Sequence, residues 1–389
     1  MPSGYKPIFE IWKGGENITA RFQDRAVHIA VELAAGGGAQ DSVEITVDDR
    51  DWLVATPRVK DRIVVHLGYE GVGTAYLGSF EVNSVRFSFP PKSISIRGTS
   101  ASSLNDLKTH TIQEFRDKTV EEILAEAGSK IGMRVDVHRS IADQRIPFLN
   151  SVTSFGSLIE RLESLHDAVA KIHDGRVTLT PRAGGRSVSD FAMPTLVLRE
   201  YSFADLEVLT DSRGETAKTI AQYKDADGNT KTVETKSQIP DLGTEASHTI
   251  GNIFNSRGEA EAAAKSVQAQ LDRSTGRINA TLAEGDPWVR DGQRIVIAGI
   301  RDGINGSYHV DLVKHEFTKS GALRTTFSGT AGIDSLAAEF ASGTADSSAF
   351  LAPGPGQVLG EVLAPAGSLS LDRDFSSVPS LIGAAPPSP

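Results

Sequence analysis

Histidines beside carboxylates are the residues of this sequence that come nearest to a metal or acid–base site. His309 and His315 lie six positions apart in a predicted strand, with Asp311 between them and Asp302 upstream. Because side chains alternate along a strand, residues six apart point to the same face, and two imidazoles with a carboxylate can hold zinc. Histidines on strand surfaces are far commoner than such sites. We therefore interpret His309 and His315 as ordinary strand residues.

A second pair, His166 and His173, flanks the end of a predicted helix and the strand after it, and each is followed by an aspartate, Asp167 or Asp174. The spacing is not the His-Glu-x-x-His of a metalloprotease, and there is no nucleophile elbow of the Gly-x-Ser-x-Gly type. These residues are expected to be solvated or to cap the helix.

Two glycine-containing segments match ligand loops only in part. Residues 225–229 have the acidic spacing of a calcium loop, but Gly228 stands fourth instead of sixth and Lys236 takes the twelfth position, where glutamate is needed. We interpret the segment as a hairpin turn. Residues 36–38 are three glycines without the Lys-Ser/Thr of a phosphate loop, which indicates a flexible connection. The sequence thus assigns no catalytic, cofactor-binding or metal-binding residue, and we expect a protein that is not an enzyme.

Composition excludes further functions. The 389 residues contain no cysteine, so neither a disulfide nor a thiolate metal site can form. The formal net charge of -10 and the absence of a basic patch argue against nucleic-acid binding. No segment approaches the roughly 18 to 20 apolar residues that cross a bilayer, and the start has no apolar secretion signal. We expect a protein that is made in a cytoplasm, stays soluble and binds no membrane.

The predicted elements divide the chain into four parts and define an α+β fold. Residues 1–100 and 183–334 carry short alternating segments separated by turn residues, as antiparallel strands do. Residues 101–182 carry two amphipathic helices, one opened by a capping box at 119–122 and one by Ser154. A third helix, rich in alanine, is predicted over 256–273. Residues 335–389 are rich in Ala, Gly, Ser and Pro and predict an extended tail.

The two β-rich parts contain an internal repeat. In the central block both copies share a Gly-Ser-aromatic start, two valines, a basic residue and a closing phenylalanine. Unrelated antiparallel sheets can share strand chemistry, but the matched order of three blocks favours a duplication. The blocks are 62–65, 78–89 and 97–99 in the first copy, and 294–297, 306–317 and 328–330 in the second.

Several segments resemble the phage late control protein D family, the hub family related to the T4 baseplate hub and to the first part of type VI secretion spike proteins. The resemblance covers roughly residues 1–333 and lies mainly in 115–124, 146–150, 281–287 and 306–315. The chain departs from the family at 151–154, where Ser-Val-Thr-Ser replaces Gln-Thr-acidic. Ser154 can still cap the following helix there.

This resemblance implies two similar tube-type antiparallel β-barrel domains, an inserted small α/β domain and an extended C-terminal tail. It implies a homotrimer at the virion tail tip, assembled in the host bacterial cytoplasm. Its six β domains would match the hexameric tail tube above, because two domains times three chains gives six. The central spike below would be a separate protein, and residues 335–389 would reach it or a baseplate wedge neighbour.

The ring would join tube to spike, and DNA would pass its lumen only as cargo. We expect part of the net negative charge to face this lumen, where like-charge repulsion would keep passing DNA from sticking. Asp48, Asp49 and Asp51 are interpreted as a solvated turn, with a charged contact to a neighbouring subunit as the alternative. The helix at 256–273 is interpreted as a cover for its sheet, with tube docking as the alternative. Two other classes of function remain: a tail-associated cell-wall hydrolase and a monomeric carbohydrate-binding β protein.

Overall fold

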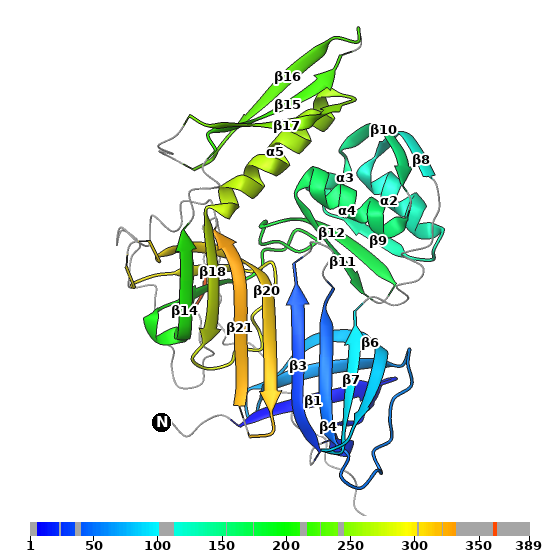
Figure 1. Cartoon of the computed structure of the whole chain (residues 1–389), viewed down its shortest axis with the longest axis vertical. Helices are drawn as coiled ribbons and strands as arrows, with labels where there is room; N and C mark the ends of the chain where they lie inside the picture. The colour runs from blue at the N-terminus through cyan, green and yellow to red at the C-terminus, as the bar shows by residue number, and fades with distance from the viewer. Residues whose placement is uncertain are drawn as a thin grey trace, which may run out of the picture.

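A computed structural model of the chain describes residues 6–22, 25–35, 40–100, 113–152, 154–173, 175–210, 216–225, 227–239, 245–301, 303–320, 322–331 and 361–363. Within these ranges the fold is mostly β with few helices, as the sequence predicts. The arrangement of the elements is shown in Figure 1.

One large sheet runs through both β-rich parts of the chain. Among the described residues it has fourteen strands, and every neighbouring pair along its main path is antiparallel. The main path is β14 (Phe203–Thr210), β18 (Gly276–Leu282), β21 (Ala322–Ala331), β20 (Gly306–Thr318), β3 (Ala26–Ala34), β4 (Ser42–Asp48), β7 (Ser93–Thr99), β6 (Gly73–Ser88), β5 (Arg62–Tyr69), β1 (Pro7–Lys13) and β2 (Glu16–Asn17). Off this path, β19 (Arg294–Ile297) pairs with β20 and with β13 (Thr195–Leu198), which also pairs with β22 (Glu361–Leu363).

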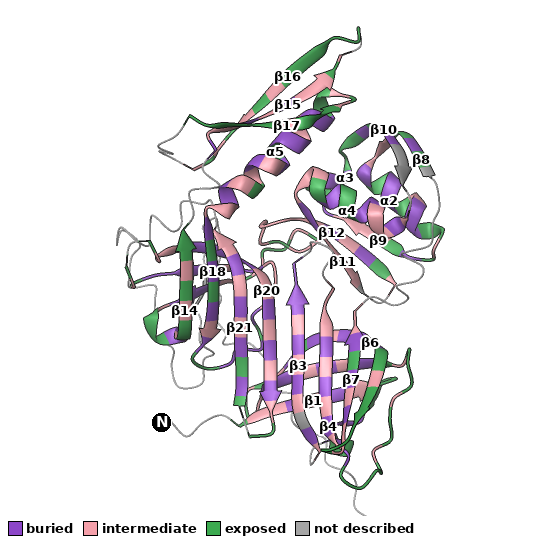
Figure 2. Cartoon of the chain, in the orientation of Figure 1, coloured by how far each residue is buried: buried purple, intermediate pink, exposed green. Residues whose placement is uncertain are grey.

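The sheet has one apolar face because buried and less buried residues alternate along its strands (Figure 2). In β4 the buried residues are Val43, Ile45 and Val47, and they belong to the same hydrophobic cluster as Val313 and Phe327 from the second β-rich part. Each fully buried side chain of this kind contributes about 1.5 to 3 kcal/mol. The two β-rich parts therefore share one core, joined by the pairing of β20 with β3.

Between the two β-rich parts the chain forms a small α/β unit with its own core. Its helix starts follow the predicted caps: the Thr119 hydroxyl accepts from the backbone N–H of Glu122, and Ser154 does the same for Ser157. Its elements are β8 (Gln113–Thr119), α2 (Val120–Ser129), β9 (Arg134–Val137), α3 (Arg139–Ala142), β10 (Arg145–Val152), α4 (Phe155–His166), β11 (Ala168–His173) and β12 (Arg176–Pro181).

The predicted third helix is α5 (Arg257–Ser274), capped by Ser256. It covers a three-stranded sheet of β16 (Thr230–Lys236), β15 (Lys218–Lys224) and β17 (Ser247–Phe254), which projects from the top of the large sheet in Figure 1. The contact is small and rich in alanine, with Ala221, Ala260 and Ala264 fully buried. The helix covers a sheet, as interpreted from the sequence, and tube docking by the same helix stays an untested alternative. Short 3-10 turns at Thr19–Arg21 and Glu200–Ser202 complete the elements described.

Ion pairs fasten the α/β unit to its neighbours. Lys171 of β11 lies 2.8 Å from a carboxylate oxygen of Asp41 and 2.6 Å from one of Asp291. Arg273 of α5 donates two hydrogen bonds to Asp167 at the end of α4. Both contacts join segments that are distant in the sequence, so they fix the unit against the sheet and against α5.

No helix in the described part of the chain is long and apolar enough to cross a membrane.

Candidate assembly site at two sheet edges

The internal repeat predicted from the sequence is visible in the strand registers. Strands β3, β4, β7, β6 and β5 correspond in order to β14, β18, β21, β20 and β19. In the first block of the repeat, four residue pairs between β5 and β6 are matched by four pairs between β19 and β20. The pairs are Arg62–Glu81, Ile63–Phe80, Val64–Ser79 and Val65–Gly78 in the first copy, and Arg294–His309, Ile295–Tyr308, Val296–Ser307 and Ile297–Gly306 in the second.

The irregularities of the sheet are duplicated as well. The ladder between β6 and β7 skips Asn83, and the ladder between β20 and β21 skips the equivalent Asp311. Likewise the ladder from β3 to β4 skips Val27, and the ladder from β14 to β18 skips Ala204. A bulge changes the direction and twist of a strand, so bulges at the same places give both copies the same curvature.

Inside the chain the two copies are joined head to tail. The lower half of β20, from Leu312 to Thr318, pairs with β3 over seven residue pairs. On the apolar face of this junction, His315 and Phe317 of β20 lie among the buried residues, as do Ile29 and Val31 of β3. The junction thus pairs the β20 edge of the second copy with the β3 edge of the first copy. These two edges lie on opposite sides of the repeated unit.

The other edge of each copy has no partner strand among the described residues, and we call it the open edge. It is β14 in the second copy and the end of β6 in the first. Among the described strands, β14 has a neighbour on one side only, which is β18. Strand β6 pairs with β5 only as far as Glu81, so residues 84–88 have β7 on one side and no described strand on the other. An edge of unpaired backbone groups is a template for pairing with another chain.

Large apolar side chains mark the open edge of β6. Phe87 is 59% exposed and Phe89 is 70% exposed, whereas their counterparts in the second copy, His315 and Phe317, are buried. Leu209 on the open edge of β14 is 53% exposed. Exposed apolar side chains gathered at an unpaired edge are typical of an interaction surface.

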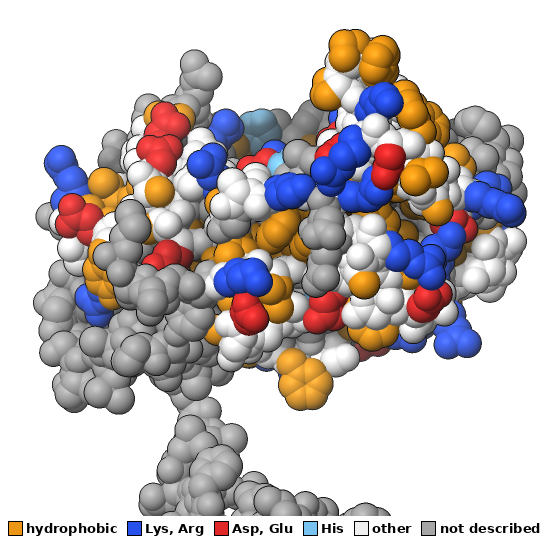
Figure 3. Space-filling model, turned by 90° about the horizontal axis from the view of Figure 1, so that it is seen from below, with side chains coloured by type: hydrophobic (Ala, Val, Ile, Leu, Met, Phe, Trp, Pro, Cys, Tyr) orange, Lys and Arg blue, Asp and Glu red, His pale blue; other side chains and the backbone are white. Residues whose placement is uncertain are grey.

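The lower end of the large sheet is a second exposed surface. The face seen from below carries hydrophobic side chains among basic and acidic ones (Figure 3). At the loops beyond β4 and β6, the ring centroids of Trp52 and Phe89 are 6.2 Å apart, and the Lys92 ammonium lies 5.0 Å from the Trp52 ring.

The nearby acidic cluster is bound within the chain. Asp51 accepts two hydrogen bonds from Arg25, which hold the pKa of that carboxyl well below its usual range. Asp49 is buried and accepts from the backbone N–H of Val54, and Asp48 pairs with Arg50 at 3.3 Å. The segment is a turn, as predicted, but it is structured by its own carboxylates instead of being freely solvated.

The structure corrects the geometry predicted for His309 and His315. Their cross-strand partners, Thr330 and Thr325, are five residues apart on β21, so the two histidines point to opposite faces. The cause is the bulge at Asp311, which shifts the alternation by one residue. Asp302, the other carboxylate considered for this site, lies outside the described residues.

His315 is fully buried in the core. Its Nε2 lies 3.1 Å from the carbonyl oxygen of Val289, and its Nδ1 lies 3.0 Å from the Thr325 hydroxyl. Burial, together with the nearby Arg290, lowers the pKa of His315 to about 3. A neutral imidazole held by two hydrogen bonds serves packing and is not positioned for acid–base chemistry at neutral pH.

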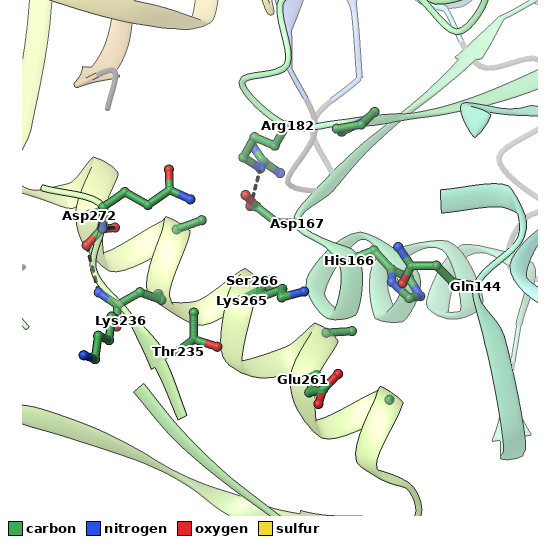
Figure 4. A pocket seen from close by; sticks show the side chains of 16 residues that line it. Gln144, His166, Asp167, Arg182, Thr235, Lys236, Glu261, Lys265, Ser266 and Asp272 are labelled. Atoms are coloured by element: carbon green, nitrogen blue, oxygen red, sulfur yellow. Dashed lines mark hydrogen bonds and ion pairs between the residues drawn. The ribbon is translucent and has the colours of Figure 1, made fainter. Parts of the chain in front are cut away.

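His166 and Asp167 lie at the edge of a groove between α4 and α5 (Figure 4). The groove has a volume of about 530 Å³ and a polar lining that includes Lys265 and Glu261. Asp167 is the C-cap residue of α4, in agreement with the capping position predicted for it, and its carboxylate is paired with Arg273 of α5. Burial lowers the pKa of His166 to about 4. Asp174 and the side chain of His173 are outside what the structure describes.

Asp272, at the other end of the groove, has a carboxylate that already accepts hydrogen bonds from neighbouring residues. Asp272 accepts hydrogen bonds from the Ser237 hydroxyl, the Gln238 backbone N–H and the Gln268 side-chain amide. It is buried, and its oxygens are committed to holding the loop after β16 against α5. The groove therefore offers no free pair of carboxylates for hydrolysis.

The remaining predicted loop is a hairpin turn. Residues 225–229 connect β15 to β16, and the Asp225 carboxylate accepts from the backbone N–H groups of Asp227 and Asn229. Lys231 lies 2.9 Å from the same carboxylate. The glycines 36–38 lie outside the described residues. Across the ranges that are described, no group of three or more histidine, aspartate or glutamate side chains could hold a metal ion.

The repeat is readable from the amino-acid sequence, but the open edges are not. The exposed Phe87 and Phe89 and the strand β14 give no local signal of being unpaired. A signal was nevertheless present in the repeat itself, because Phe87 and Phe89 align with His315 and Phe317. In the structure, the β20 segment pairs with β3, whereas the β6 segment has no second described neighbour.

Comparisons with known structures define the class of protein. The fold resembles a tail protein from Neisseria meningitidis MC58, with a TM-score of 0.60 and 12% identity over 84% of this chain and 97% of that one. It also resembles the 43 kDa tail protein of prophage MuSo2 from Shewanella oneidensis, with a TM-score of 0.57 and 13% identity over 82% of this chain and 97% of that one. The fold is that of phage tail proteins.

Two relatives found by sequence similarity are both described as probable baseplate hub proteins. The chain is 20% identical over 353 residues to the "Probable baseplate hub protein" of Escherichia phage 186, a match that covers 81% of this chain and 90% of the relative. It is 22% identical over 193 residues to the protein of the same description in Escherichia phage P2, which covers 49% of this chain and 50% of that relative. No protein-family model matches the chain. The chain is thus similar to phage baseplate hub proteins in sequence and to phage tail proteins in fold.

Proposed function

We propose that this chain is a structural, non-catalytic hub protein in the baseplate of a contractile phage-type tail. The observation that carries the proposal is the duplicated five-stranded unit, whose copies are joined through one pair of edges and leave the complementary pair open. The similarity to the hub protein of phage 186 along 90% of that relative supports the same role. The protein would be located in the tail of the virion.

The duplication supports a trimer that adapts one symmetry to another. Three chains carry six copies of the repeated unit, so a ring of three chains presents a six-fold set of similar surfaces. Such a ring joins a hexameric tail tube above to a trimeric central spike below. The spike is a separate protein. We propose that the C-terminal part of the chain, of which Glu361–Leu363 pairs with β13, serves to contact the spike or a baseplate wedge neighbour.

The domain division follows from the same proposal. Residues 1–100 and 183–334 are the two tube-type β domains, 101–182 the inserted α/β domain and 335–389 the extended tail. The two copies of the repeat fall within the first and third of these ranges, which supports the division. The α5 unit belongs to the third range and packs on a sheet of its own.

The lumen of the proposed ring would be lined by the polar face of the large sheet. On that face Glu44 pairs with Arg97 at 3.1 Å, and Glu316 pairs with Lys314 at 2.6 Å. These paired charges of both signs leave no excess of positive charge at these positions, which is compatible with the expectation that part of the net negative charge faces the lumen. DNA would pass through such a lumen as cargo without a basic surface to retain it.

The mass of the purified chain in solution tests this function. Light scattering is expected to give three times the mass of one chain. A monomer would contradict the proposed hub and would favour the carbohydrate-binding alternative. Release of muropeptides from purified cell wall would instead favour the tail-associated hydrolase, and the proposal predicts no release.

A further inference from the structure

We propose that the trimer closes by pairing the open edge of β6 with β14 of the next chain, in the register that β20 and β3 use inside the chain. This inference rests on the proposed function, because it takes the partner at both edges to be a second copy of this chain. It adds the residues that meet and their order along the two strands.

The register follows from the repeat without further assumptions. Residues of β20 correspond to residues of β6 that are 228 positions earlier, since Gly306 corresponds to Gly78. Residues of β14 correspond to residues of β3 that are 177 positions earlier, since the matched ladders align Phe203 with Ala26. Each pair of the internal junction therefore predicts one pair between chains.

The predicted pairs form a ladder of five. The internal pairs Val313–Leu33, Lys314–Glu32, His315–Val31, Glu316–Ala30 and Phe317–Ile29 become Val85–Thr210, Arg86–Leu209, Phe87–Val208, Ser88–Glu207 and Phe89–Leu206 between neighbouring chains. Pro90 follows directly and has no N–H to donate, so the ladder ends at Phe89.

Side-chain chemistry fits this ladder on the apolar face. Phe87 and Phe89, which are largely exposed in the single chain, would lie opposite Val208 and Leu206. Both aliphatic residues already pack against the edge of the shared core, so the pairing would extend that core from one chain into the next. Pairs of an aromatic with an aliphatic or β-branched residue across strands each contribute roughly 0.2 to 1 kcal/mol beyond alanine.

The polar face fits as well. Arg86 would lie opposite Leu209 and diagonal to Glu207, within reach of a long side chain. At the internal junction, the corresponding cation is Lys314, and Glu32 lies directly opposite it. Each junction thus places a cation of the β6 or β20 edge near a glutamate of the β3 or β14 edge.

The same kind of contact, repeated between chains, supplies the junctions that a closed ring requires. Head-to-tail contacts between different surfaces produce a ring when the rotation repeats an integral number of times. In this chain the first step of the ring is already built, because the second copy is joined to the first by the same two kinds of edge. Six such junctions, three within chains and three between them, complete the proposed ring.

Disulfide trapping tests the register, and the cysteine-free chain supplies a clean background. The variant Ser88→Cys with Glu207→Cys places two exposed residues in a predicted pair, at a separation that a disulfide can bridge. Mild oxidation of the full chain is expected to link chains into covalent pairs and triples on a denaturing gel. Ser88→Cys with Leu209→Cys is the control that is two residues out of register on the same face, and it is expected to link poorly.

A matched pair of cysteines at the internal junction serves as the positive control for disulfide formation. Glu316→Cys with Ala30→Cys is the equivalent pair at the internal junction and should form an intramolecular disulfide. If this pair closes and the chain is trimeric but Ser88→Cys with Glu207→Cys does not link, the register is wrong and the hub function stands. The same conclusion follows if the out-of-register pair links better. A monomer in solution would overturn both proposals.

Discussion

Gly98 and Gly329 occupy equivalent positions in the two repeats, and each lies against a backbone carbonyl oxygen of the neighbouring strand. A Cβ atom on Gly98 would be 2.8 Å from the carbonyl oxygen of Glu81, and one on Gly329 would be 2.1 Å from that of His309. Both glycines stand one pair before the bulge in their ladder. The close approach of the strands there leaves no space for a side chain, so both copies keep glycine for the same reason.

Substituting these glycines is expected to destabilise the chain in proportion to the overlap. Gly329→Ala should lower the free energy of unfolding by about 2 to 3 kcal/mol and Gly98→Ala by about 1 kcal/mol, because the backbone must move to accept a methyl group. Denaturant unfolding measures both values. Gly251→Ala is the control: nothing lies within 4 Å of its Cβ position, so stability should be unchanged or slightly higher. Equal losses in all three variants would contradict the steric explanation.

The parts of the fold that local chemistry determines were predictable. The helix caps at Thr119, Ser154 and Ser256 lie where the sequence placed them, because a hydroxyl that can accept from the third backbone N–H is a local signal. The repeat was also readable, since duplicated strands keep their order. Neither feature depends on which strand lies beside which.

The pairings between distant strands were not predictable. Nothing near β3 or β20 indicates that they meet across almost 300 residues of sequence, yet this pairing merges the two β-rich parts into one sheet. The alternation in β20 was misread for a similar reason: the bulge at Asp311 is defined by its partner strand and not by its own residues. The candidate site consists of the strand edges that these pairings leave without a partner. It could therefore be identified only from the structure.

The ion pairs of Lys171 are expected to contribute strongly to the attachment of the α/β unit. Burial alone would lower the pKa of Lys171, but Asp291 and Asp41 outweigh burial and raise it. Lys171→Met leaves two largely buried carboxylates without their cation, which should cost about 3 kcal/mol of stability. Thermal unfolding of the purified variant checks this value.

A surface ion pair is the matched control for Lys171. Lys218 lies 2.9 Å from Glu234 with both side chains more exposed, so Lys218→Met should cost at most about 1 kcal/mol. Adding Asp291→Asn to Lys171→Met should restore part of the loss, because one unpaired charge is removed. Equal losses of stability for Lys171→Met and Lys218→Met would contradict a larger contribution from the buried ion pairs of Lys171.

The cap of α5 should be replaceable by another acceptor. The Ser256 hydroxyl accepts from the backbone N–H of Glu259, so Ser256→Ala is expected to cost about 1 kcal/mol. Ser256→Asp keeps an acceptor and adds a favourable charge at the helix start, and it should retain most of the stability. Chemical denaturation distinguishes the two. An aspartate variant as unstable as the alanine variant would contradict a capping role.

Stability is expected to fall as the pH falls from about 6.5 towards 3, and His315 should account for part of this loss. The pKa of His315 is lowered from 6.5 to about 3, first by burial and then by Arg290. Between these values the unfolded chain binds a proton that the folded chain does not, so the free energy of unfolding decreases with decreasing pH. The decrease from this residue is roughly 3 kcal/mol between pH 6.5 and pH 4.

Replacing the imidazole separates its titration from that of the carboxylates. Denaturant unfolding of His315→Gln at several pH values is expected to show a shallower decline than that of the natural sequence, whatever its stability at pH 7. Parallel curves for His315→Gln and the natural sequence would mean that His315 is protonated alike in both states. That result would exclude the neutral imidazole that the burial of His315 and the nearby Arg290 favour.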